Sequence, residues 1–238
     1  MTLRPITEEP EVGCPLGICD GTGWVLDDAG DATRCECAER RIRASAGRRM
    51  GTGVPKRYRG VSFDRRPICD LDPSVIRPVR QYVRDIGDNL GRGRGLWFFG
   101  DVGTGKTSLA MLVSRAAQEA GRSVAIYSMP RLLADIRDTY DRESGGAPYS
   151  AFFRRLCSVD LLHLDDLGAE HRTDWVLEQL YSIVNERWQD QRAMVVTTNV
   201  IDLGQLREQI GSRTVSRLSE MCDAHPVFGA DLRMTAGE

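Results

Sequence analysis

The sequence predicts an α/β fold in which helices cover both faces of a parallel sheet. Short apolar runs alternate with longer amphipathic segments through most of the chain, which is the pattern of parallel strands joined by helices. The run 96–99 leads into a glycine-rich turn and a helix start, and the run 161–164 ends in two carboxylates, Asp165 and Asp166. Because the carboxyl ends of parallel strands meet at one edge of a sheet, we expect a ligand site there.

The individual elements follow from apolar spacing and from the residues that begin or end them. Pro130 suits the first turn of a helix, and Gly121 suits the end of one. We expect strands at 96–99, 123–128, 159–164 and 193–198, which place four strands of a five-stranded sheet. We expect helices at 74–90, 107–120, 130–142, 149–157 and 174–189.

The glycine-rich turn fits the P-loop pattern G-x-x-x-x-G-K-[ST] at every fixed position. The predicted nucleotide-binding residues here are Gly100, Asp101, Val102, Gly103, Thr104, Gly105, Lys106, Thr107 and Ser108. In such a loop the backbone N–H groups point at phosphate oxygens, and the positive end of the following helix adds to the attraction. Lys106 would reach the β- and γ-phosphates and Thr107 would bind Mg²⁺. Lys106 is also one of only two lysines in a chain rich in arginine.

The two carboxylates after the run 161–164 have the form of a Walker B motif. Asp165 would hold Mg²⁺ through water, and Asp166 takes the place of the residue that polarises the attacking water. The side chain of Asp166 is shorter than the glutamate common at this place, so we expect slow hydrolysis, suited to a switch. Asn199 ends the next strand, where its amide could contact the γ-phosphate or the lytic water, the sensor-1 role.

Arg213 and Arg217 stand four residues apart, which places them on one helix face. No acidic residue is spaced to pair with both. We interpret one of them as an arginine finger that acts on the nucleotide of a neighbouring subunit, and leave open which one. The alternative is an ordinary surface salt bridge.

Four cysteines form two close pairs in the N-terminal segment. Cys14 and Cys19 precede a hairpin-like stretch, and Cys35 and Cys37 follow it. A module this small cannot bury enough apolar surface to fold alone, whereas two thiolate pairs can hold a tetrahedral Zn²⁺. The spacing predicts a zinc-binding module, with unligated cysteines as the alternative. We expect Cys69, Cys157 and Cys222 to pack as small apolar residues.

Length and composition fit one α/β domain with a small appendage. We divide the chain into the zinc module with a basic linker, residues 1–50, and an ATPase domain, residues 51–238. The net charge of −2 gives no global field that would attract a polyanion. Because no apolar run could span a membrane and no signal segment begins the chain, we expect a cytoplasmic protein without membrane contact.

Together these motifs resemble the AAA+ ATPases of the DnaC/DnaI helicase-loader group, which is close to the IstB transposition helpers. The resemblance is carried by GDVGTGKTSLA, LLHLDDLG, TTN and GSRTVSRLSEMC followed by GADLR, and it covers about residues 54–233. It implies an AAA+ domain without the C-terminal helical lid of many relatives. The cysteine pattern is similar to the zinc-binding head of DnaI-type loaders, the part that grips the replicative helicase.

The resemblance implies an ATP-dependent loader of the hexameric replicative helicase, whose subunits associate in the ATP state and hold single-stranded DNA. Basic residues in the segment where related loaders contact DNA are Arg131, Arg137, Arg142, Arg154 and Arg155. The segment Lys56, Arg57 and Tyr58 is similar to one that packs near the adenine. Two other functions stay open: an IstB-like transposition helper, and an adaptor that binds nucleotide without hydrolysis.

Overall fold

The computed structural model describes residues 14, 16–26, 30–38, 53–140 and 149–232. The chain divides into two compact units, Met1–Arg43 and Ala44–Glu238. The expected boundary between residues 50 and 51 falls in a stretch outside the described residues, so it stays a prediction.

The N-terminal unit contains a short antiparallel hairpin. Strand β1 (Trp24–Leu26) pairs with strand β2 (Ala32–Arg34), with Val25 opposite Thr33. Three-residue strands are too short to form an apolar core of their own. Among the described residues of this unit, the buried side chains are those of Cys35 and Cys37, which are almost fully enclosed.

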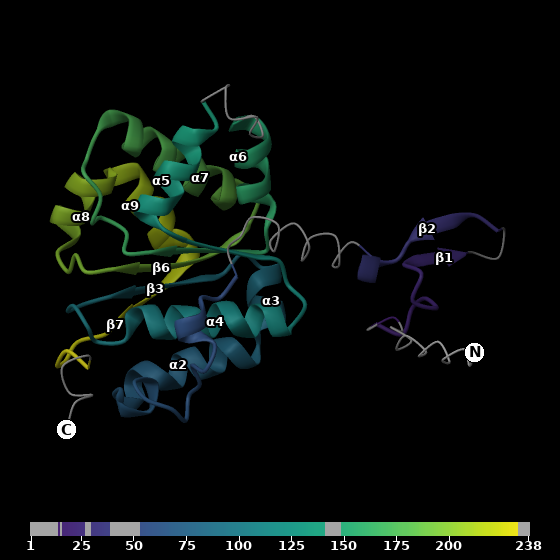
Figure 1. Ribbon diagram of the computed structural model, residues 1–238, viewed down its shortest axis with the longest axis horizontal. Coiled ribbons are helices and arrows are strands. Elements are labelled where there is room, and N and C mark those ends of the chain that lie inside the picture. The colour runs from purple at the N-terminus through teal and green to yellow at the C-terminus, as the bar shows by residue number, and fades with distance from the viewer. Residues whose placement is uncertain (1–13, 15, 27–29, 39–52, 141–148, 233–238) are drawn as a thin grey trace, which may run out of the picture. The chain divides into compact units, whose positions relative to one another are not determined.

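The second unit is built around a five-stranded parallel sheet with the strand order β4-β5-β6-β3-β7 (Figure 1). Its strands are β3 (Gly95–Phe99), β4 (Val124–Ser128), β5 (Leu161–Asp165), β6 (Ala193–Thr198) and β7 (Cys222–Pro226). Every neighbouring pair in this sheet is parallel. The four expected strands are confirmed, and that at 193–198 has both of its ends as predicted.

Strand β7 had no predicted position, although a fifth strand was expected. Its sequence, CDAHP, contains aspartate and proline, which disfavour strands, and it lacks an apolar alternation. It forms because β3 offers a free edge, along which Gly95 pairs with Cys222 and Phe99 with Pro226.

One face of the sheet is covered by helices α2 (Pro73–Arg84), α3 (Ile86–Gly91) and α4 (Lys106–Glu119) (Figure 1). Short 3-10 helices, Lys56–Tyr58 and Ile68–Asp70, precede them. The helix expected at 74–90 is divided, because Asp85 leaves helical geometry and serves both as the end of α2 and as the start of α3. Helix α4 fits the prediction to within a residue.

The other face is covered by α5 (Met129–Asp138), α6 (Tyr149–Ser158), α7 (Asp174–Gln189), α8 (Leu203–Ile210) and α9 (Ser212–Met221) (Figure 1). Helix α5 ends four residues earlier than expected, at Asp138, and the last part of the expected helix lies outside the described residues. Helix α8 was not predicted. A buried apolar cluster lies on each face of the sheet.

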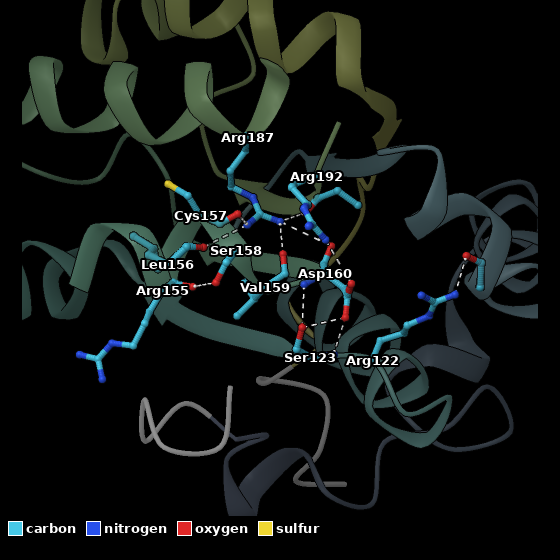
Figure 2. A network of polar contacts seen from close by, with 12 residues as sticks. Arg122, Ser123, Arg155, Leu156, Cys157, Ser158, Val159, Asp160, Arg187 and Arg192 are labelled. Carbon is cyan, nitrogen blue, oxygen red and sulfur yellow. Dashed lines mark hydrogen bonds and ion pairs between the residues drawn. The ribbon is translucent and has the colours of Figure 1, made fainter. Parts of the chain in front are cut away.

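The amino ends of the strands are joined by a buried arginine (Figure 2). Arg187 of α7 is fully buried and donates hydrogen bonds to the backbone carbonyls of Leu156, Cys157, Val159, Asp160 and Ala193. Burial lowers the pKa of its guanidinium to about 9. These bonds tie the end of α6 and the starts of β5 and β6 to α7, so Arg187 fixes the end of the sheet opposite the P-loop.

The three isolated cysteines differ in exposure. Cys157 and Cys222 are buried, as expected, but Cys69 is exposed and donates a weak hydrogen bond to Asp70, so its prediction was wrong. Cys69 is exposed because it lies in the short helix Ile68–Asp70, where Ile68 alone is buried. Among the helices that the structure describes, none is long and apolar enough to cross a membrane.

Candidate nucleotide site and thiolate cluster

The carboxyl ends of the strands border a cleft of about 770 Å³. Predicted residues that line it are Arg57, Tyr58, Val102, Gly103, Thr104, Gly105, Lys106, Thr107, Ser108, Asp165, Asp166 and Asn199. Gly60, Val61, Arg66, Pro67, Asp70, Thr197 and Leu232 line it as well and were missed. The structure therefore brings together the P-loop, both carboxylates and Asn199.

The P-loop has the backbone shape that its glycines allow. Gly103 and Gly105 have φ angles of 81° and 94°, which L side chains rarely adopt. A Cβ atom on Gly103 would also come within 2.0 Å of the carboxylate of Asp231. Helix α4 begins at Lys106, so its unpaired N–H groups and the positive end of its dipole face the loop.

Lys106 is almost fully buried, and its ammonium donates to the backbone carbonyls of Gly100 and Asp101. Those two residues support the lysine without lining the cleft. An ammonium buried in this way remains solvated by carbonyls and can exchange them for phosphate oxygens. Lys56 is exposed and is not among the lining residues, so it does not join Arg57 and Tyr58 there.

Asp165 receives hydrogen bonds from two hydroxyls. Thr107 Oγ1 donates to Asp165 Oδ1 over 2.9 Å, and Thr197 Oγ1 donates to the same oxygen over 2.7 Å. Burial opposes ionisation of this carboxyl, but His163, Thr197 and Thr107 together outweigh burial and lower its pKa. Asp165 is therefore held as a carboxylate beside a hydroxyl, which is the kind of donor set that Mg²⁺ prefers.

Asp166 is held in a left-handed conformation, with a φ of 63°. Its backbone N–H donates to Thr197 Oγ1 over 2.9 Å, and Asn199 Nδ2 donates to its carboxylate over 2.6 Å. Asn199 therefore orients Asp166 directly. Thr197 contacts the carboxylate of Asp165 and the backbone N–H of Asp166, a role that the sequence analysis missed although the motif TTN contains it.

Glu170 lies in the turn that follows Asp166. Its Oε2 accepts from the N–H of Gly168 over 2.9 Å, while its buried Oε1 has no hydrogen-bond partner among the described residues. Burial, with the charge of Asp166 as a lesser cause, raises its pKa. Sequence reasoning missed this residue, since a single glutamate in a polar loop gives no signal.

Arg213 and Arg217 lie on α9 and face aromatic rings of α7. The Arg213 guanidinium is 6.0 Å from the ring centre of Tyr181, and that of Arg217 is 3.5 Å from that of Trp188. Arg217 also pairs with Glu220 over 3.4 Å. Neither arginine lines the cleft of its own chain.

Four of the five expected DNA-binding arginines lie on α5 and α6, with differing partners. Arg131 pairs with Asp135 over 2.7 Å, Arg137 stacks 4.8 Å from the centre of the Trp175 ring, and Arg154 is exposed. Arg155 is half-buried, and Arg142 lies outside the described residues.

Aromatic side chains accompany these arginines. Tyr140 stacks on Tyr149 with ring centres 5.3 Å apart, and Tyr149 contacts Phe153 at 5.7 Å. Phe152 is buried in the core, and Phe153 packs against the core. More than half of the Tyr140 surface remains exposed, so this row of three stacked or tilted rings ends in an accessible ring.

The four N-terminal cysteines form one cluster. Their sulfur atoms all lie within 4.8 Å of one another, with Cys14 and Cys35 at 3.8 Å and Cys19 and Cys37 at 3.5 Å. Zn–S bonds of about 2.3 Å in a tetrahedron place sulfur atoms about 3.8 Å apart. The backbone N–H of Cys19, with help from those of Ile18 and Leu16, lowers the pKa of Cys14 to about 6. The cluster can therefore hold a tetrahedral, thiolate-preferring metal ion.

Comparison with known proteins agrees with this site. Residues 87–224 match the sequence model of a family described as IstB-like ATP binding protein. The chain is 25% identical over 190 residues to the replicative helicase loader DnaC of Escherichia coli K12, covering 79% of this chain and 75% of the relative. The crystal structure of the DnaC helicase loader matches with a TM-score of 0.63 and 25% identity, over 73% of this chain and 99% of that one. The structure of DnaI, 20% identical with a TM-score of 0.54, covers 79% of this chain and 93% of its own and shows the same fold.

Proposed function

The chain belongs to the IstB-like ATP-binding family, and from this premise we propose that it is an ATP-dependent loader of a hexameric replicative helicase onto single-stranded DNA. The observation that carries the proposal is the likeness to the helicase loader DnaC, which covers 79% of the chain. The AAA+ domain would act as a slow ATPase that switches the loader between two states.

The residues of the cleft account for binding and for slow hydrolysis. The loop N–H groups and Lys106 would hold the phosphates, and Thr107 and Asp165 would hold Mg²⁺. When bound, Mg²⁺ would supply positive charge that offsets the charge of the phosphates. Asp166, which Asn199 orients, would polarise the attacking water from a shorter side chain than glutamate. A turnover typical of a motor ATPase would contradict this interpretation.

Self-association in the ATP state would complete the site. Arg213 and Arg217 lie outside their own cleft, on the surface of α9, so either could reach the γ-phosphate only of a neighbouring subunit. Mixing Lys106→Ala subunits with subunits that carry Arg213→Ala or Arg217→Ala tests this. The expected result is partial recovery of hydrolysis, because an intact arginine of one subunit would serve the intact P-loop of the other.

Single-stranded DNA would lie along α5 and α6. The exposed Tyr140 ring and the cations Arg137 and Arg154 offer stacking and phosphate contacts together. Substituting Arg137 and Arg142 by alanine should weaken single-strand binding and flatten its salt dependence, and Arg94→Ala, outside this segment, is the control. Unchanged affinity would contradict the assignment.

The thiolate cluster would bind Zn²⁺ and present the N-terminal unit to the helicase. We would run size-exclusion chromatography with light scattering on the full chain with the replicative helicase of the same source, with and without ATP. The Cys19→Ser/Cys37→Ser variant should lose the complex, whereas Cys69→Ser, which alters an exposed cysteine outside the cluster, should keep it.

The family match itself favours a second candidate, an IstB-like transposition helper. Absence of a helicase complex, together with intact ATP binding and assembly on duplex DNA, would establish that function instead. An adaptor that does not hydrolyse nucleotide would show binding but no turnover. Hydrolysis that single-stranded DNA stimulates and Lys106→Ala abolishes would argue against the adaptor.

A further inference from the structure

A histidine lies where the surrounding core is apolar. His163 is in the middle of β5 and is fully buried. Its neighbours across the sheet are Ile126 on β4 and Val195 on β6, and both belong to the apolar cluster under α4. Packing alone would be served by an aliphatic residue, because a buried imidazole must find partners for two nitrogens.

One nitrogen has such a partner on α4. Ser114, also fully buried, places its Oγ 3.0 Å from His163 Nδ1. Ser114 follows Thr107 by seven residues, or about two helical turns, so both hydroxyls lie on the face of α4 that meets β5. Helix and strand are therefore joined by two polar contacts, Ser114 with His163 and Thr107 with Asp165.

The other nitrogen faces the Walker B carboxylate. Residues 163 and 165 point to the same side of β5 because side chains alternate along a strand. His163 Nε2 has no hydrogen-bond partner among the described residues and lies 3.8 Å from Asp165 Oδ1. Thr107 and Thr197 bond to that same oxygen, so three groups surround Oδ1 of a carboxylate that lines the cleft.

We propose that His163, oriented by Ser114, is a positioning residue that keeps the Asp165 carboxylate in the orientation needed to hold Mg²⁺ with the nucleotide. This inference rests on the proposed ATPase function and deepens it. The imidazole would act as a second residue that orients a metal-binding carboxylate. Loss of such a partner commonly weakens metal binding about tenfold or more.

Four variants of the full chain test the two nitrogens of His163 and the hydroxyl of Ser114 separately. His163→Leu removes both nitrogens, and Ser114→Ala removes the orienting hydroxyl. His163→Asn keeps a polar atom near the Nδ1 position, and His163→Gln keeps a donor near the Nε2 position. Val195→Ala is the matched control, since it disturbs the same core layer on the neighbouring strand but does not face Asp165.

The main readout is the affinity for a fluorescent ATP analogue with and without Mg²⁺. The ratio of the two affinities in His163→Leu should fall about tenfold, while the affinity without Mg²⁺ stays unchanged. The Mg²⁺ concentration for half-maximal hydrolysis should rise to a similar extent. His163→Gln should recover most of the ratio, His163→Asn should recover little, and Ser114→Ala should fall between wild type and His163→Leu.

Two failures can be told apart. If wild type binds the analogue without any Mg²⁺ effect and does not hydrolyse ATP, the proposed function is wrong. If wild type shows the Mg²⁺ effect and His163→Leu matches Val195→Ala, the positioning role is wrong. Should His163→Leu fail to fold, a ratio in His163→Asn or Ser114→Ala equal to that of wild type would also overturn the inference.

Discussion

The two ends of the central sheet carry polar networks of different kinds. At the amino ends, Arg187 donates to backbone carbonyls that include that of Asp160, and Asp160 and Ser123 bond to each other through backbone N–H groups and side chains, away from solvent (Figure 2). At the carboxyl ends, Asp165 and residues of the P-loop line a cleft, and helix α4 begins there at Lys106. The first network holds elements together and is closed off from solvent, although the buried Arg187 Nε has no partner among the described residues. The second network lines an open cleft with a cation and carboxylates. Buried polar groups therefore do not mark a functional site by themselves, and an open cleft beside them is also needed.

Substitution of Lys106 should distinguish most clearly between the carboxyl ends of the sheet, which would serve hydrolysis, and the amino ends, which serve stability. Lys106→Ala removes the cation that would hold the β- and γ-phosphates, so ATP hydrolysis should fall at least about a hundredfold. The melting temperature without nucleotide should change by only a few degrees, because the ammonium donates to the carbonyls of Gly100 and Asp101, which lie in a loop. A steady-state phosphate assay and thermal unfolding check both parts. Retained turnover would show that the cleft is not the site of hydrolysis.

Substitution of Arg187 should have the opposite pattern. Arg187→Met leaves buried carbonyls of α6, β5 and β6 without donors, and we expect a loss of about 3 kcal/mol in unfolding free energy. Urea unfolding measures this loss, and ATP affinity should hardly change at temperatures where the variant is folded. Arg192→Met, which breaks a partly exposed pair with Asp160, is the control and should cost about 1 kcal/mol or less.

Thr197 should affect the chemistry more than the binding. Thr197→Val keeps the shape but removes the donor to Asp165 and the acceptor for the N–H of Asp166. Hydrolysis should fall about tenfold to a hundredfold with a smaller change in ATP affinity, which single-turnover and binding measurements separate. Thr198→Val tests the neighbouring hydroxyl, which bonds the carbonyl of Leu167, and its effect should be on stability instead.

The smallest expected effect is a pH-dependent one at Glu170. Because its folded-state pKa is raised, the charged form destabilises the fold above that pKa, and the penalty disappears below the unfolded-state value of about 4.3. Glu170→Gln should therefore melt about 2 °C higher than wild type at pH 8 and at the same temperature at pH 4. The exposed Glu178→Gln controls for loss of one charge. A melting-temperature difference that does not change with pH would mean that ionisation of Glu170 is not what destabilises the fold.

Local patterns in the sequence determined most of the fold and the phosphate site. The helix Asp174–Gln189 and the strand Ala193–Thr198 have the ends that apolar spacing predicts, and the P-loop and Asp165 meet because strand ends share an edge. The cysteine spacing likewise predicted a cluster that the structure brings together. In each case the signal lies within a few consecutive residues, where periodicity and motif chemistry act directly.

Only the tertiary structure decided the contacts between distant segments. Strand β7 exists through pairing with β3 and has little strand propensity of its own, and Leu232 joins the cleft from the end of the described chain. His163 has no motif spacing, and its place between Ser114 and Asp165 depends on how α4 packs on β5. Arg187 finds its carbonyl partners in the same way. These roles come from pairing and packing across many residues of chain, which a linear pattern does not encode.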